Sequence, residues 1–189
     1  MSPLLSAFCL ALLGIVASTS ACQFPDTPLS SNITDGFSIY VQNASIPVIH
    51  NRVLNFRPNG LDMHLVLRPA GEPTNDTLYL QNGRVIYNTL HAVIDLEYDP
   101  DNSTTKIFMT DRTYHPVGIF QPVYGCNPET DALQIELEVA TRLTDPPVNG
   151  GKVGIRRVVD TYEFRYSPPD NSLLTPEWLS VTLVLFRNG

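Results

Sequence analysis

The sequence is poor in the residues that mark several common classes of protein. It has only 2 Lys beside 10 Arg, and these face 19 acidic residues, for a net charge of −7. The basic residues are scattered singly apart from Arg156–Arg157, so no basic stripe could follow a phosphate backbone or an anionic membrane. We therefore expect neither nucleic acid nor a membrane as a partner of the mature chain.

The sequence also lacks the motifs that usually identify a catalytic or cofactor site. It contains no G-x-S-x-G nucleophile motif, no H-E-x-x-H zinc motif and no Gly-rich phosphate-binding loop. No long segment keeps a 3.6-residue apolar period, so amphipathic helices are not expected. These absences predict no catalytic residues, no cofactor and no enzymatic activity.

Only one long apolar run is present, from Leu4 to Ala17, within 21 N-terminal residues that contain no charged side chain. The run is short for a membrane span, lies at the very start of the chain and is followed by small residues. Residues 1–21 are therefore predicted to be a secretory signal peptide cleaved after Ala21. We expect a soluble monomer outside the cell, either free or associated with the cell wall.

Cysteine is scarce, with 3 in all, and Cys9 lies in the predicted signal peptide. Cys22 and Cys126 would be the two cysteines of the mature chain, and in an oxidising compartment they are expected to form a disulfide. A bridge over about 104 residues stabilises by roughly 4–5 kcal/mol on the chain-entropy model. A bacterial lipoprotein is the alternative for Cys22, but "TSAC" lacks the usual Leu of a lipobox.

N-glycosylation motifs, in contrast, are frequent. Four N-x-[ST] sequons begin at Asn32, Asn43, Asn75 and Asn102. Asn75 and Asn102 fall where turns are expected, and a turn can carry a glycan. We expect at least two of the four to be glycosylated in a eukaryotic host.

Short β-prone runs separated by turn residues fill the chain from Phe37 onward, after a Pro/Ser/Thr-rich arm at residues 22–36. The predicted strands are Phe37–Gln42, Pro47–His50, Val53–Arg57, Met63–Arg68, Thr77–Gln81, Arg84–Tyr87, Leu90–Glu97, Thr104–Thr110, Val117–Gln121, Ala132–Val139, Val153–Arg157, Thr161–Tyr166 and Ser180–Phe186. The clearest signals are the hairpin turn Asn82–Gly83 and the alternation of "ALQIELEV". A helical turn is expected at "TPEW", with Thr175 as its cap.

Roughly 10–13 short strands without crossover helices predict a single antiparallel all-β domain over residues 37–189. A closed barrel of the β-trefoil kind suits the strand count and is preferred, and a two-sheet sandwich is the alternative. A threefold repeat of roughly 40–50 residues would support the trefoil. Only "LYLQNGRVIY…AVIDLEY…TTKIFMT" resembles one trefoil unit, and no second copy aligns with it.

Two groups of polar residues suggest chemistry. Asp62 and His64 share one face of a predicted strand, about 7 Å apart, and could supply two metal ligands if His50, His91 or His115 supplied a third. A strand between the turns Pro58–Gly60 and Pro69–Gly71 explains the same pattern more simply. Met63, Leu65 and Leu67 would face the core, and His64, Val66 and Arg68 would form the partly solvated face. We favour this structural interpretation, and no metal site is predicted.

Asp95 and Glu97 also share a face, with His91 too far along the strand to join them. Their spacing is compatible with the carboxylate pair of a glycoside hydrolase, but such pairs usually come from different strands in a cleft. Glu136 and Glu138 repeat the spacing, so it is not specific. Loop aromatics, namely Tyr114, Tyr124 and Trp178, could instead stack on a sugar, or simply pack loop ends.

The segments "QNASIPVIHNRVLNF", "HLVLRPAGEP", "LHAVIDLEY", "KIFMTDR" and "FQPVYGCNPETDALQIELE" resemble uncharacterised small secreted proteins of filamentous fungi over nearly the whole mature chain. The resemblance implies an extracellular or cell-wall glycoprotein. Our leading hypothesis is a non-catalytic protein that binds glycan or wall material or another extracellular partner. A small glycan-active hydrolase using Asp95 or Glu97 and a host-directed effector are the alternatives.

Overall fold

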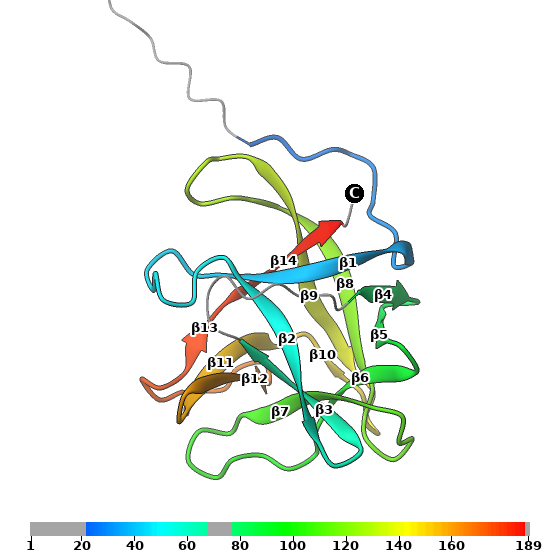
Figure 1. Cartoon of the computed structure of the whole chain (residues 1–189), viewed down its shortest axis with the longest axis vertical. Coiled ribbons are helices and arrows are strands. Elements are labelled where there is room, and N and C mark those ends of the chain that lie inside the picture. Colours follow the sequence, from blue (N-terminus) through cyan, green and yellow to red (C-terminus); the bar gives the residue numbers. More distant parts are fainter. Residues whose placement is uncertain (1–21, 68–76, 188–189) are drawn as a thin grey trace, which may run out of the picture.

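The computed structural model describes residues 22–67 and 77–187 (Figure 1). These residues contain strands and turns but no helix, and every strand pairing is antiparallel. No helix that could cross a membrane occurs in this part of the chain. The prediction of an antiparallel all-β protein is confirmed, whereas the predicted signal peptide and Asn75 lie outside the described residues.

The strands follow one another in three units of similar plan. The first unit contains β1 (Ile33–Gln42), β2 (Arg52–Asn59), β3 (Asp62–Leu67) and β4 (Leu78–Gln81). The second contains β5 (Arg84–Tyr87), β6 (Leu90–Ile94), β7 (Thr105–Thr110) and β8 (Gly118–Cys126). The third contains β9 (Leu133–Arg142), β10 (Val148–Asn149), β11 (Lys152–Val158), β12 (Thr161–Ser167), β13 (Leu179–Ser180) and β14 (Thr182–Arg187).

The first and last strands of the units close a barrel. β1 pairs with β4 and β14, β5 pairs with β4 and β8, and β9 pairs with β8 and β14. The hairpins β2–β3, β6–β7 and β11–β12 lie across one end, where β3, β7 and β12 all pair with one another. We call these three hairpins the cap; in Figure 1 they occupy the lower part of the molecule. This is the β-trefoil arrangement, so the preferred prediction is confirmed and the sandwich alternative is wrong.

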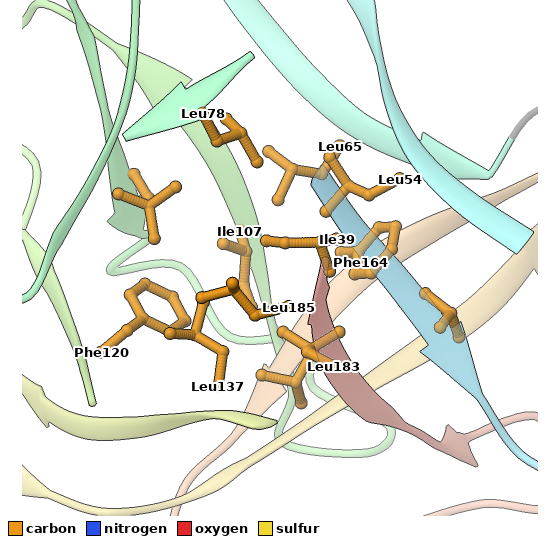
Figure 2. Close-up of a cluster of buried hydrophobic side chains, with 14 of the residues drawn as sticks. Ile39, Leu54, Leu65, Leu78, Ile107, Phe120, Leu137, Phe164, Leu183 and Leu185 are labelled. Carbon is orange, nitrogen blue, oxygen red and sulfur yellow. The ribbon is translucent and has the colours of Figure 1, made fainter. Parts of the chain in front are cut away.

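The core lies between the barrel and the cap. Figure 2 shows side chains from both parts converging on one centre, among them Ile39, Leu137 and Leu185 of the barrel. The strand register places Leu65, Ile107 and Phe164 at equivalent positions of β3, β7 and β12. All three positions are buried, but each carries a different apolar residue. Because burial constrains hydrophobicity and volume more than identity, the threefold plan is scarcely visible in the sequence.

A tight turn joins the first unit to the second. Asn82 and Gly83 both have positive φ, 49° and 77°, as a type I′ hairpin turn requires. The carbonyl of Gly83 accepts a hydrogen bond from the Phe120 N–H at 2.7 Å, and a Cβ on Gly83 would lie 2.8 Å from the Phe120 carbonyl oxygen. Glycine therefore serves both the turn and the close approach of β8 that closes the barrel.

Several local predictions were wrong. Residues 47–50 form turns held by hydrogen bonds to the Ile46 carbonyl, not a strand. The "TPEW" segment is a single turn closed by the Trp178 N–H and the Thr175 carbonyl, not a helix. β1 begins at Ile33, so the extended arm is shorter than residues 22–36, and the trefoil-like echo spans the end of one unit and the start of the next.

The alternation predicted in "ALQIELEV" is confirmed over most of its length. Leu137 and Val139 of β9 are 3% and 5% exposed, and Glu138 is exposed. Leu133 departs from the pattern, with 45% exposure, because it lies at the outer end of the long β8–β9 hairpin. The core does not extend that far.

The N-terminal arm is held against β8. Cys22 and Cys126 form a disulfide with a Cα–Cα distance of 5.8 Å, as the cysteine count predicts. Phe24 stacks on Tyr124, with ring centroids 6.4 Å apart. The disulfide thus ties the start of the described chain to the end of β8, across a sequence separation of 104.

We expect the double variant Cys22→Ser/Cys126→Ser to lose about 4–5 kcal/mol of unfolding free energy, because the unfolded chain regains the entropy of a long open loop. Urea unfolding of the oxidised wild type and of the variant measures the difference. Reduced wild type should match the variant. An unchanged unfolding midpoint would contradict the structural importance of the bridge.

Candidate functional site

The outer face of the cap carries polar side chains around its pseudo-threefold axis. His64, Lys106 and Glu163 occupy equivalent positions, next to the buried Leu65, Ile107 and Phe164 in the strand alternation. His64 Nδ1 lies 3.9 Å from a Glu163 oxygen, and Arg57 approaches the same oxygen at 3.5 Å.

The adjacent His64 imidazole, with Lys106 and Arg57 nearby, lowers the pKa of Glu163 below its ordinary value. Arg57, His64, Lys106 and Glu163 therefore form one cluster of polar side chains at the cap axis.

The structural interpretation of the Asp62–His64 stretch is supported. Asp62 lies 3.6 Å from Arg112, and His64 Nε2 is 2.8 Å from the Asn59 amide nitrogen. Met63 packs against the core and Leu65 and Leu67 are buried, as expected. Val66, expected on the solvated face, is only 3% exposed, because β12 pairs alongside it.

The histidines considered as third metal ligands have separate partners. His50 contacts Glu129 at 3.0 Å, and His115 contacts Asp95 at 3.5 Å. His91 is on β6, where burial and the nearby Arg84 lower its pKa. Across residues 22–67 and 77–187, no three potential ligands are placed to hold one metal ion.

A polar depression of about 360 Å³ lies beside the cap axis and is lined mainly by the β6–β7 connection. Its lining includes Lys106, which also belongs to the cluster at the axis, and carries both signs of charge together with one aromatic ring. The lining residues are Asp95, Glu97, Tyr98, Asp99, Pro100, Asp101, Lys106, Arg156 and Arg165. We call this feature the cap depression.

A buried arginine of β9 holds the first half of the β6–β7 connection. Arg142 is 3% exposed and donates to the backbone carbonyls of Ile94 and Asp95. Its Nη1 also donates to the Tyr98 hydroxyl at 2.5 Å, and its guanidinium lies 5.1 Å from the Tyr98 ring centroid. Tyr98 keeps 38% of its surface exposed while its ring is held in one place.

A second buried arginine holds the other half. Arg165, also 3% exposed, donates to the hydroxyl and the carbonyl of Thr104, each at 2.7 Å. Arg156 donates to Asp99 at 2.7 Å. The Asp101 N–H and this arginine lower the pKa of Asp99, and burial lowers the pKa of Arg165. The connection lacks regular secondary structure but is fixed at both ends by charged hydrogen bonds.

The carboxylate pair considered for hydrolysis lies in this depression. Asp95 and Glu97 both line it, but they come from one continuous segment, as do Asp99 and Asp101. Asp95 additionally accepts the Leu96 N–H and contacts His115. The acids are therefore arranged along one wall, not across a cleft.

The other residues considered in the sequence lie elsewhere. Glu136 and Glu138 line a separate groove beside β9. Tyr114 is 65% exposed on the β7–β8 connection, and Tyr124 packs against the arm. Trp178 covers Gly154 of β11, where a Cβ would lie 2.4 Å from the indole.

Sequence reasoning missed Tyr98, Arg142 and Arg165 as residues of this site. Nothing in the local pattern distinguishes these arginines from solvent-exposed ones, because their carbonyl acceptors lie 47 and 61 residues away in the chain. Only the fold brings each guanidinium to the connection that it holds.

The fold and the site define a β-trefoil protein whose cap depression is charged and carries one fixed aromatic ring. Residues 23–188 match the family model described as a domain of unknown function (DUF7909), and because the match covers most of the chain, the protein belongs to this family. Neither the curated proteins nor the solved structures contain a match to the chain.

The lowered pKa values of Asp99 and Glu163 predict acid sensitivity. A lowered folded-state pKa stabilises the fold above the ordinary carboxyl pKa, here 3.8 and 4.5, and this stabilisation is lost as pH falls through the folded values. We expect the variant Asp99→Asn/Glu163→Gln to be less stable than wild type at pH 7 and to lose less stability between about pH 5 and pH 2. Urea unfolding across that range tests this, and parallel stability curves would contradict it.

Proposed function

We propose that the protein is a secreted, non-catalytic glycoprotein that binds glycan, such as cell-wall polysaccharide, in the cap depression. The observation that carries the proposal is the exposed Tyr98 ring, fixed by the buried Arg142 beside a row of charged side chains. The predicted signal peptide and sequons, and the resemblance to small secreted proteins of filamentous fungi, support the extracellular and fungal setting.

The lining of the depression suits a sugar better than most ligands. Each sugar hydroxyl both donates and accepts hydrogen bonds, and the depression offers acceptors in Asp95, Glu97 and Asp101 and donors in Lys106 and Arg156. An aromatic face adds an apolar contact for the C–H face of a pyranose ring. Since the β6–β7 connection that lines the depression is already ordered, binding of a sugar would cost little conformational entropy.

The same geometry favours binding over hydrolysis. A glycoside hydrolase needs two carboxylates on opposite sides of the scissile bond. The acids of the depression come from the single segment 95–101, and Asp99 is already bound to Arg156. We therefore prefer the binding protein to the hydrolase.

We expect Tyr98→Ala to weaken retention on the preferred wall polysaccharide about tenfold, through loss of the stacking surface. Pull-down of the glycosylated mature protein on a panel of insoluble wall polymers identifies the ligand, and titration with its soluble oligosaccharides gives the affinity. Glu97→Gln and Asp101→Asn, which leave Arg142 and its partners intact, should weaken binding less.

Tyr79→Ala is the matched control, because Tyr79 is 40% exposed on β4, outside the depression. This variant should bind as wild type does. Retention of no polymer by the wild type would contradict the proposal, and equal losses in the two tyrosine variants would place binding outside the depression.

We also expect Asn32 to carry a glycan when the protein is secreted from a eukaryotic host. Asn32 is exposed, whereas the Asn43 amide donates to the Ser180 carbonyl at 2.8 Å and Asn102 is 6% exposed. A glycan on a buried amide would displace packed neighbours, so Asn102 should be the least occupied of these three. Mass spectrometry of peptides after enzymatic deglycosylation reports each site, and an unmodified Asn32 would contradict the expectation.

A further inference from the structure

The third trefoil unit lacks a strand pairing that the other two units make. Where β1 leaves β4, its residues Tyr40 and Val41 pair with β2, and in the second unit β5 pairs with β6. The equivalent strand of the third unit, β11, pairs with β12 and β13 but makes no pairing with β9. Residues 143–151, with two prolines and two glycines, separate β9 from β11 instead.

A groove of about 450 Å³ opens where this pairing is missing. β9 and β14 pair at Ile135 and Glu136 and then diverge. We call the opening the seam groove; its lining residues are Gln121, Glu136, Leu137, Glu138, Val139, Ala140, Gly150, Gly151, Lys152, Val153, Val181, Thr182 and Leu183. Its volume lies within the range of ordinary ligand pockets.

One wall of the seam groove is a free strand edge. Residues 137–140 of β9 face β8 on one side. On the groove side, the described chain supplies a single backbone hydrogen bond to them, from the Gly150 N–H to the Ala140 carbonyl at 2.8 Å.

The opposite wall, formed by the start of β14, also leaves the side that faces β9 unpaired. Thr182 and Leu183 pair with β1 but not with β9.

The turn at the end of the groove keeps the edge accessible. Gly151 has φ +109°, and a Cβ there would lie 2.3 Å from the Tyr166 ring. Only glycine fits, so backbone forms this rim. Proteins usually protect free strand edges with bulky or charged groups or with a covering loop. Here the 143–151 segment contributes the two-residue β10, which pairs with β9 at Thr141 and Arg142, and the Gly150 N–H at the end of the groove, and it leaves residues 137–139 uncovered.

We propose that the seam groove binds an extended polypeptide segment of a partner protein, which adds a strand beside β9 as β2 and β6 do beside their own barrel strands. Unpaired peptide groups on a strand edge provide affinity for another backbone. The free edge spans about four residues, the length of a short added strand.

The side chains of β9 specify the chemistry of the partner. Glu136 and Glu138 point to one face of the strand, and Leu137 and Val139 point to the other, toward the core. Glu138 lies within the free edge, and Glu136 lies at its end, where β9 still pairs with Val184 of β14. A strand alongside residues 137–140 therefore places its own side chains alternately next to this acidic row and next to the apolar row. Opposite charges across neighbouring strands stabilise and like charges destabilise, so the fitting segment alternates basic and apolar residues.

The test uses the full mature protein and three labelled hexapeptides, acetylated and amidated at their ends. We expect a Lys-Val repeat to bind by fluorescence anisotropy and a Glu-Val repeat not to bind. In the third peptide, the Lys-Val repeat is methylated at the backbone nitrogen of each lysine. This peptide keeps its charges but loses backbone donors, and it should show no binding. Amide hydrogen exchange should report new protection at residues 137–140, whereas protection elsewhere would overturn the assignment.

Glu138→Gln should weaken the Lys-Val peptide about two- to fivefold, the value of one cross-strand charge pair. Asp131→Asn, at an acid in the β8–β9 turn outside the groove, is the matched control and should leave the affinity unchanged. Equal weakening by both variants, or equal binding of the N-methylated peptide, would show a general charge effect and overturn strand addition.

Two other occupants are also tested. If soluble wall oligosaccharides displace the bound peptide, the occupant of the groove is a sugar and the proposal is overturned. If sedimentation velocity shows a dimer that dissociates when peptide is added, the occupant is a second copy of the chain, which also overturns the proposal. Because Tyr98 does not line the seam groove, Tyr98→Ala should leave peptide binding intact. Failure of glycan binding is thereby distinguished from failure of strand addition.

Discussion

Closure of the barrel at the junction of β5 and β8 is the constraint on which the rest of the structure depends. The pairing is short, between Arg84 and Ile119, and it is extended by the hydrogen bond from Phe120 to the carbonyl of Gly83. Without this junction the six barrel strands would form an open sheet with two long free edges. Closure removes those edges and leaves an apolar end that the three hairpins of the cap must cover.

The cap covers that end and, at the same time, creates the candidate site. Its hairpins present Leu65, Ile107 and Phe164 to the core, so the alternate positions must face outward. Not all of these become surface, because Arg165 is buried under the β6–β7 connection. A buried guanidinium requires several acceptors, and the carbonyls of an irregular segment supply them more readily than those of a paired strand. The need to satisfy Arg142 and Arg165 thus explains why the connection is irregular and yet fixed.

The three units differ most in how they fill the space between barrel and cap. In the first two units the second strand pairs directly with the first, so the barrel is closed between these two strands. In the third unit, β11 is displaced by the segment that contains Pro146, Pro147, Gly150 and Gly151, and the seam groove remains open. Departures from internal symmetry are informative in a trefoil, since the symmetric parts already satisfy the fold.

The sequence by itself determined the local features: the all-β class, most strands, the Asn82–Gly83 turn, the alternation around Leu137 and the pairing of Cys22 with Cys126. These follow from φ preferences, two-residue periodicity and cysteine count, which act between near neighbours or leave only one choice. The strand that contains Asp62 and His64 was also predicted, with Leu65 and Leu67 toward the core. The tertiary structure alone decided the roles of Tyr98, Arg142 and Arg165, the burial of Val66 and the opening beside β9. Each of these depends on which distant segments meet, because a hydrogen-bond acceptor or a missing strand has no signature in the residues that surround it in the chain.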